Sequence, residues 1–295
     1  MLRPLARLIT SLGLVALATT AAQAPVDAVY YDGYLGKVFQ YRVREGESLL
    51  EIGRRFDLGF NEVTAANAGV DPYMPFPGTL VTIPTAWIPP ELSPRPSIVV
   101  NLAELRLYFF PKDPADPLLS FPIGIGDEGT DTPLGLYTVE RKSLNPSWHV
   151  PASILQQRQD LPPVVPPGPE NPLGTRALHL AGNDILIHGT NRPWGIGRRS
   201  SHGCIRLYPE DIVRLFECVG RGTQVLIVNR PVKVGLRKGK VFLEVHGEGN
   251  YQAEPGEVLH QMARLDLLAK IDIGLVVRAV SEKRGYPVEV TSIRR

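Results

Sequence analysis

The chain has 295 residues, of which 43% are hydrophobic and 21% charged, and its formal net charge is +2. This is the composition of an ordinary globular protein, long enough for one large domain or two to three smaller ones. The first 24 residues hold two arginines and no acid, so their removal brings the charge to 2 − 2 = 0. A neutral chain gives no electrostatic case for binding nucleic acid or an anionic membrane.

The first 24 residues have the layout of a secretory signal peptide. Arg3 and Arg7 precede an apolar run over residues 8–18, and small residues follow up to Ala24. The apolar run is shorter than the roughly 20 residues that a membrane-spanning helix needs. We therefore expect residues 1–24 to be removed on export and the mature chain to have no permanent membrane span. An uncleaved N-terminal anchor is the alternative.

Residues 39–84 are predicted to form a compact strand–helix–helix–strand unit. Ser48 is placed as a helix N-cap, and Glu51 three residues later completes a capping box. A second helix is expected over 61–67, with Asn61 as its cap. The stretches "VREGESLLEIGRRF", "AAN" and "PGTLVTIP" resemble the LysM family along its whole length. The resemblance implies binding of N-acetylglucosamine-containing glycans, and hence of peptidoglycan; a small βααβ domain without a ligand is the alternative.

The proline-rich residues 85–96 are expected to be a linker into a larger unit, residues 97–230. Short apolar strands joined by Gly/Pro turns predict a β-rich domain with few helices, so the chain as a whole is expected to be mainly β. "TRALHLAGNDILIHGT" predicts a hairpin that ends at His188. The pattern of residues 231–295 predicts a hairpin, one amphipathic helix and a last strand. No catalytic or binding residue is predicted in this C-terminal extension.

Residues 143–172 interrupt the regular strand pattern. Six of the twelve residues in "LPPVVPPGPENP" are proline, which excludes a helix interior or a central strand. A long ordered loop in a compact domain is usually functional. We expect this segment to be a lid that limits access of water.

"HGTNRPWGIGRRSSHGCIRL" holds His188, His202 and Cys204, although the chain has only six histidines and two cysteines. A thiolate is a strong nucleophile, and a nearby imidazole lowers the thiol pKa and shuttles protons. Gly203 lets a substrate carbonyl approach closely. A nucleophile–base pair therefore explains the cluster best, with His202 either supporting the pocket or only ordering the loop. Metal binding is the weaker interpretation, because no second His or Cys pair is nearby.

Cys218 is the other cysteine, fourteen residues after Cys204. It lies next to the apolar face of a predicted helix, "PEDIVRLFECVG", so we expect a free buried cysteine. A disulfide with Cys204 would consume the best nucleophile in the chain.

"IHGT" followed by "SHGCIRL", with sixteen residues from His188 to Cys204, closely resembles the catalytic motif of the L,D-transpeptidases (YkuD type). "TPLGLYTV", "PPGPENPLGTRAL" and "GTQVLIV" match the same family. The resemblance implies that Cys204 is the nucleophile, that His188 is the general base and acid, and that the Gly189 carbonyl orients the imidazole. It further implies a pocket shaped by Ser201, His202, Gly203 and Arg206.

Arg206 stands where many members of that family have asparagine, which resembles the Gram-negative envelope branch. It is expected to hold a substrate carboxylate or to form a structural ion pair. The family's reaction implies release of D-alanine from a peptidoglycan tetrapeptide stem and transfer of the acyl group from the cysteine to an amine. No metal or cofactor is expected.

The order of LysM module, catalytic domain and C-terminal extension resembles the branch that attaches an outer-membrane lipoprotein, through a lysine, to peptidoglycan. We therefore expect that acceptor, in the periplasm of a Gram-negative envelope. The alternatives are 3→3 crosslinking of stems, release of bound lipoprotein, or a peptidoglycan-binding scaffold with an inactive site. A papain-like protease is disfavoured, because it has its cysteine before its histidine.

Overall fold

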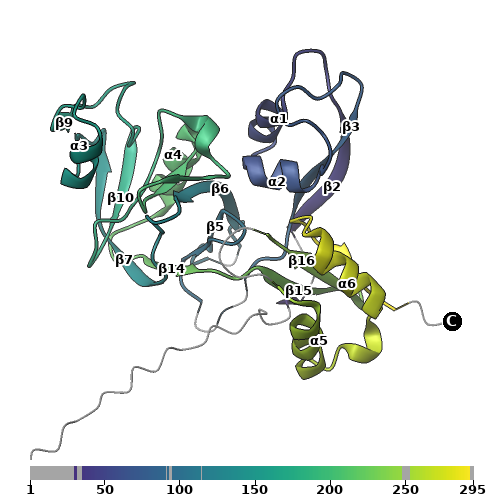
Figure 1. Ribbon diagram of the computed structural model, residues 1–295. Coiled ribbons are helices and arrows are strands. Elements are labelled where there is room, and N and C mark those ends of the chain that lie inside the picture. Colours follow the sequence, from purple (N-terminus) through teal and green to yellow (C-terminus); the bar gives the residue numbers. More distant parts are fainter. Residues whose placement is uncertain are drawn as a thin grey trace, which may run out of the picture.

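A computed structural model describes residues 30–31, 35–90, 92, 95–113, 115–247 and 253–292. The expected signal peptide, residues 1–24, lies outside these residues. The described part is mostly β with six α-helices, as the sequence predicted, and it forms three units with separate hydrophobic cores. Figure 1 shows them as an N-terminal module (purple to blue), a large sheet unit (teal to green) and a C-terminal unit (green to yellow). No helix in the described ranges is long and apolar enough to cross a membrane.

The N-terminal module pairs β2 (Leu35–Arg42) antiparallel with β3 (Leu80–Trp87), and α1 (Leu49–Arg55) and α2 (Phe60–Ala65) pack on this ribbon. The capping box at Ser48 is confirmed, because its hydroxyl accepts from the Glu51 N–H and the Glu51 carboxylate accepts from the Ser48 N–H.

The cap expected for the second helix was wrong. Gly59, not Asn61, is the N-cap of α2, and its N–H donates to Glu62 Oε2 at 2.7 Å. Asn61 instead donates its amide to the Glu104 carbonyl of the sheet unit. A Cβ at position 59 would lie 2.7 Å from the Gly197 Cα. Tertiary packing against the next unit therefore selects glycine here, which no local pattern indicates.

The sheet unit contains nine strands in the order β12-β6-β13-β11-β10-β7-β14-β4-β5, and a further β5–β6 pairing closes it on itself. Its core is lined by alternating strand residues and by the apolar face of α4 (Pro209–Cys218). The strands are β4 (Ile98–Asn101), β5 (Arg106–Phe109), β6 (Leu119–Gly126), β7 (Gly135–Leu144), β10 (Arg176–Leu180), β11 (Leu186–His188), β12 (Arg199–Ser201), β13 (Ile205–Leu207) and β14 (Gln224–Val228). A short 3-10 helix, Pro193–Gly195, precedes β12.

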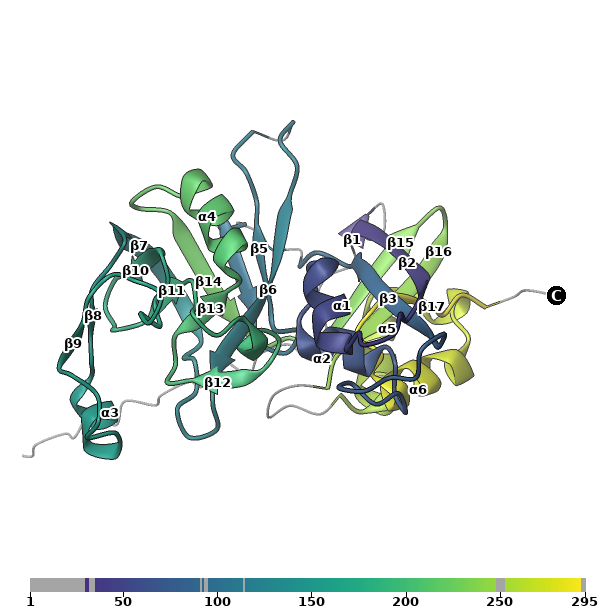
Figure 2. The same ribbon diagram turned by 90° about the horizontal axis from the view of Figure 1, so that it is seen from above.

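The segment expected to be a lid leaves the sheet between β7 and β10 and lies at the end of the molecule farthest from the N-terminal module (Figures 1 and 2). It contains α3 (Ala152–Gln157) and a two-residue ribbon of β8 (Trp148–His149) and β9 (Val164–Val165). Asn171, fully buried, fastens both ends: its amide donates to the carbonyls of Pro146, Val165 and Pro166. The segment is thus an ordered loop with one short helix.

The C-terminal unit pairs β15 (Val232–Arg237) with β16 (Lys240–Val245), which confirms the predicted hairpin. β17 (Val288–Glu289) and, from before the N-terminal module, β1 (Tyr30–Tyr31) flank the hairpin. The expectation of a single helix was wrong: α5 (Pro255–Arg264) ends before a 3-10 turn, Leu268–Lys270, and α6 (Ile273–Glu282) follows. Leu267, at the break after α5, is itself buried in the unit's core, so tertiary packing decides where that helix stops.

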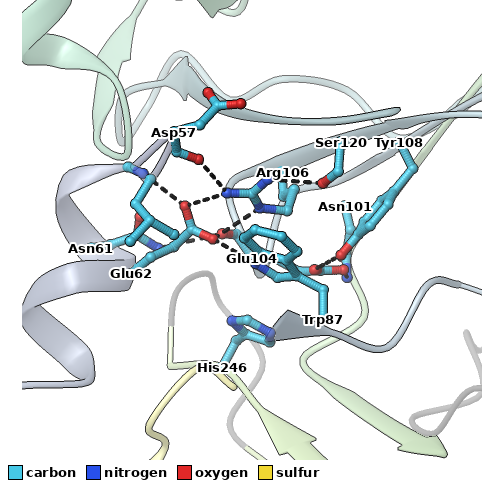
Figure 3. A network of polar contacts seen from close by, with 12 residues as sticks. Asp57, Asn61, Glu62, Trp87, Asn101, Glu104, Arg106, Tyr108, Ser120 and His246 are labelled. Carbon is cyan, nitrogen blue, oxygen red and sulfur yellow. Dashed lines mark hydrogen bonds and ion pairs between the residues drawn. The ribbon is translucent and has the colours of Figure 1, made fainter. Parts of the chain in front are cut away.

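A buried polar network joins the three units (Figure 3). Glu62 of the N-terminal module pairs with Arg106 of the sheet unit at 2.9 Å. Lys233 of the C-terminal unit lies 2.8 Å from both Glu104 and Glu244, and it also donates to the Ile88 carbonyl. Because a buried charge is costly without a partner, these pairs fix how the units are docked.

Candidate active site

Hydrogen-bond register places two parallel rows of side chains on one face of the sheet. Strand residues alternate between faces, and laterally paired residues share a face. The registers β7–β10, β10–β11 and β11–β13 align one row that runs from β7 to the residue before β13: Arg141, His179, Leu186 and Cys204. The neighbouring row on the same face is Ser143, Ala177, His188 and Arg206. His188 and Cys204 are thus diagonal neighbours on adjacent strands, and Figure 2 shows these strands side by side.

The intervening residues point the other way, into the hydrophobic core: Leu178, Ile187 and Ile205 are fully buried there. The face that carries the two rows opens into a cavity of about 910 Å³. His188 and Cys204 both line it, and the lid segment contributes part of its wall through residues 146–154. These strands therefore pack an apolar face into the core and present a polar face to the cavity.

His188 ends β11 and is only 3% exposed. Its Nδ1 lies 2.6 Å from the Gly189 carbonyl oxygen, which can only accept a hydrogen bond. The proton is therefore on Nδ1, and Nε2 is left as a proton acceptor. Burial lowers the pKa of His188 to about 3, with Arg206 acting in the same direction and the Gly189 carbonyl opposing both.

Cys204 is half-buried, and its Sγ lies 3.9 Å from the Asp184 carbonyl. Burial raises the pKa of the Cys204 thiol, although the Leu186 N–H and Arg206 act to lower it. The net shift is upward because desolvation outweighs the favourable neighbours. In the free site both groups are neutral, a thiol beside an uncharged imidazole.

The loop that presents the cysteine is held by hydrogen bonds on both sides. Ser201 donates its hydroxyl to the Cys204 carbonyl at 2.5 Å, and Thr132 donates to the Gly203 carbonyl at 2.9 Å. Gly203 has φ +96°, a conformation that residues with a Cβ rarely adopt. Thr132 was not predicted as a site residue, because it lies 72 positions before Cys204 and no motif marks it.

His202 and Arg206 also line the cavity. His202 is exposed at the rim, whereas Arg206 is half-buried and donates from Nη1 to the Ser200 carbonyl at 2.9 Å. Arg206 Nε is buried and makes no hydrogen bond within the described part of the chain. No carboxylate of the described residues lies at ion-pair distance from Arg206.

Comparisons with known proteins fit this geometry. The family profile of the L,D-transpeptidase catalytic domain (YkuD) matches residues 95–227, and that of the LysM domain matches residues 41–84. The Escherichia coli protein YcfS, named as a probable L,D-transpeptidase, is 39% identical over 83% of this chain and 81% of its own length. The chain belongs to the L,D-transpeptidase family.

Two further Escherichia coli proteins named as probable L,D-transpeptidases are similar. YbiS is 37% identical over 80% of both chains, and ErfK/SrfK is 36% identical over 81% of this chain and 80% of its own. The protein is thus an L,D-transpeptidase that acts on peptidoglycan, with an N-terminal LysM module, here the βααβ module described above.

Both cysteines of this L,D-transpeptidase are free, so Cys204 and Cys218 form no disulfide. The expectation of a buried Cys218 was wrong: the residue is exposed at the C-terminal end of α4. The core side of α4 is instead made by Ile212 and Leu215, with Val219 just after the helix. Cys218 is the last residue of the helix, and its side chain lies outside the face that packs on the core.

Three acidic or imidazole groups in the described residues, Glu104, Glu244 and His246, lie close enough together to hold a metal ion. They belong to the junction between the units, not to the cavity. The ammonium of Lys233 lies 2.8 Å from both carboxylates. This cation already provides the counter-charge that a metal ion would supply.

Proposed function

We propose that this L,D-transpeptidase works through a Cys204 acyl-enzyme and passes the acyl group to a lysine amine of an outer-membrane lipoprotein. The observation that carries the first half is the diagonal placement of Cys204 and His188 on one cavity face, with His188 Nδ1 fixed by the Gly189 carbonyl. This leaves Nε2 as the only ring atom able to take the thiol proton.

In the first step His188 Nε2 takes the proton from the Cys204 thiol as Sγ attacks the carbonyl carbon of the third stem residue, diaminopimelate. This carbonyl forms the peptide bond to the terminal D-alanine. The carbon–nitrogen bond breaks, His188 returns the proton to the departing amine, and D-alanine leaves. A thioester remains on Cys204. Because thiol and imidazole both begin neutral, His188 has to accept the thiol proton for Sγ to act as the nucleophile.

In the second step a neutral amine attacks the thioester carbonyl, His188 takes a proton from the amine, and the thiol is restored. The lid segment limits competing attack by water, because it walls the cavity and is fastened by Asn171. Asp184 beside Cys204 adds a negative group that favours approach of a cationic amine before it loses its proton.

The order of LysM module, catalytic domain and C-terminal unit supports the lipoprotein acceptor. The similarity to the Escherichia coli proteins extends over about four fifths of the chain and so includes more than the catalytic domain. With export through cleavage of residues 1–24, the enzyme would act in the periplasm, where stem peptides and lipoprotein meet. The LysM module would hold the glycan while the cavity takes the stem.

Release of D-alanine from purified disaccharide-tetrapeptide tests the chemistry. The wild-type protein should release D-alanine and give a mass adduct on Cys204, whereas Cys204→Ala should do neither and His188→Ala should be severely slowed. Cys218→Ser, which removes the other thiol, is the matched control and should keep full activity. Full activity in Cys204→Ala would rule out the acyl-enzyme.

Competition between acceptors tests the second half. A lysine-terminated lipoprotein peptide and a diaminopimelate-containing stem are offered together, and the products are separated by mass. A stem–lysine adduct in excess is expected; exclusive 3→3 stem dimers would show that the enzyme is a crosslinking transpeptidase. Hydrolysis of a preformed stem–lysine adduct would point instead to lipoprotein release.

A further inference from the structure

The cavity has a second polar cluster, away from the cysteine, in Arg141, Ser143 and His179. The three side chains form a closed triangle: Arg141 Nη1 lies 2.7 Å from Ser143 Oγ, Arg141 Nη2 lies 2.9 Å from His179 Nδ1, and Ser143 Oγ lies 2.9 Å from His179 Nε2. All three residues line the cavity that also holds Cys204 and His188. The catalytic steps above use none of them.

The direction of each hydrogen bond follows from the chemistry of the groups. Arginine can only donate, so His179 Nδ1 accepts and the imidazole proton is on Nε2, which donates to Ser143 Oγ. Ser143 Oγ therefore accepts from both neighbours, and its own hydroxyl proton remains available. Burial, with Arg141 beside it, lowers the pKa of His179, so the imidazole stays neutral. The cluster thus presents one guanidinium charge and a free hydroxyl donor.

We infer that Arg141, Ser143 and His179 form a subsite for a carboxylate of the stem peptide, held by the guanidinium and by the Ser143 hydroxyl. An arginine fork and a hydroxyl are the donors that suit a carboxylate, and His179 positions both. This inference rests on the proposed function, because it takes the stem bound for attack by Cys204 as the ligand.

The position of the cluster indicates which carboxylate it binds. His179 lies in the same row as Cys204, two strands away, which is about 10 Å at the usual strand spacing of about 4.8 Å. Extended chain covers about 3.4 Å per residue, so the subsite lies roughly three residues' reach from the scissile carbonyl. Diaminopimelate preceded by a γ-linked glutamate, whose two extra methylenes lengthen the chain, spans about that distance. The ligand group is therefore the free α-carboxylate of the γ-linked glutamate.

The other carboxylate and guanidinium groups that line the cavity belong to Asp184, Glu140 and Arg206. Asp184 lies at the opposite end, beside Cys204. Glu140 lies at the irregularity of the β7–β10 register, between Val139 and Arg141, and it lines the cavity close enough to His179 to oppose the lowering of that imidazole's pKa. Arg206 is the other arginine that lines the cavity, in the row next to Cys204. Arg141 is thus the cation at the end where the glutamate would lie.

Two tetrapeptide stems test the inference, one with a free glutamate α-carboxylate and one with the corresponding carboxamide. Their dissociation constants are measured by calorimetry on Cys204→Ala, which cannot turn them over. The free acid should bind about tenfold to a hundredfold more tightly, the range for one charge-assisted hydrogen-bonded contact. Arg141→Ala in the same background should bind both stems equally, Arg141→Lys should restore part of the preference, and the exposed Arg278→Ala in the C-terminal unit should leave it unchanged.

In the enzyme with Cys204 intact, Arg141→Ala should raise KM for D-alanine release and leave kcat nearly constant, whereas a merely structural loss would lower kcat. Equal binding of the two stems with Arg141 present, a preference that survives Arg141→Ala, or no binding of either stem would each overturn the inference. A normal preference without D-alanine release would instead contradict the proposed reaction and leave the subsite standing.

Discussion

Arg106 of the sheet unit and Glu62 of the N-terminal module form a bidentate ion pair, with Nε–Oε1 and Nη2–Oε2 both at 2.9 Å. The side chains are 0% and 2% exposed. Trp87 donates its indole N–H to the same carboxylate, and the Arg106 guanidinium lies over the Trp87 ring. The LysM module is therefore docked on the catalytic unit through a desolvated charge pair and is no freely tethered domain.

Breaking this pair should cost far more stability than breaking an exposed one. Glu62→Gln leaves the Arg106 charge buried without a counter-ion and should lower the free energy of unfolding by about 3–5 kcal/mol. Urea unfolding followed through the emission of Trp87 measures the effect at the site. The control is Asp160→Asn, which breaks the exposed Arg158–Asp160 pair and should change stability by about 1 kcal/mol or less. Equal effects of the two variants would show that the buried pair does not hold the module.

Stability should depend on pH through a second contact between the same units. Asp211 of α4 is buried beside Asp57, with Arg214 Nη1 3.5 Å and 3.8 Å from the two carboxylates. Burial, and then Asp57, raises the pKa of Asp211 to about 8, against about 3.9 in an unfolded chain. Since the folded pKa is the higher one, this stabilisation is complete below about pH 4 and is lost as pH rises through about 8.

Asp211→Asn imitates the protonated form and should flatten that dependence. Melting temperatures between pH 5 and pH 9 should fall less steeply with pH in the variant than in the wild type, and the variant should be the more stable at pH 9. Glu210→Gln, one residue earlier and exposed, should follow the wild type. Parallel curves for Asp211→Asn and wild type would contradict the assignment.

The reactivity of Cys204 should show that its thiol is not ionised at rest. Because burial raises the pKa of this thiol, alkylation by iodoacetamide in the Cys218→Ser background should still be accelerating as pH passes 9.0, the usual thiol value. The His188 pKa of about 3 predicts no inflection near pH 6.5. A plateau of alkylation below pH 7 would reveal a thiolate–imidazolium pair instead. Mass spectrometry follows the modification directly.

Loosening the lid should favour water over the amine acceptor. Asn171→Ala leaves the carbonyls of Pro146, Val165 and Pro166 without their buried donor, a loss of about 1–3 kcal/mol for the segment. The ratio of hydrolysed stem to transferred stem should rise, while D-alanine release continues. Gln156→Ala, exposed on α3 of the same segment, is the control. An unchanged ratio would show that the lid does not protect the thioester.

Much of the candidate site could be predicted from the sequence because its proposed reacting residues lie in two short stretches. "IHGT" and "SHGCIRL" occupy neighbouring strands, and Ser201, Gly203 and Arg206 accompany Cys204 in the chain. Arg141, Ser143 and His179 had no such signal, since they come from two strands whose pairing sets their position. The catalytic roles of Cys204, His188 and Gly189 stay predictions until the variants are measured.

Local chemistry in the sequence determined the capping box at Ser48, the hairpin that ends at His188 and the mainly β character of the chain, because these depend on neighbours within a few residues. Tertiary structure alone decided the cap of α2, the exposure of Cys218, the separation of α5 from α6 and the net direction of the Cys204 pKa. Each of these depends on desolvation or packing by residues far away in the chain. Burial is a property of the assembled fold, and it reverses what adjacent side chains would do in water.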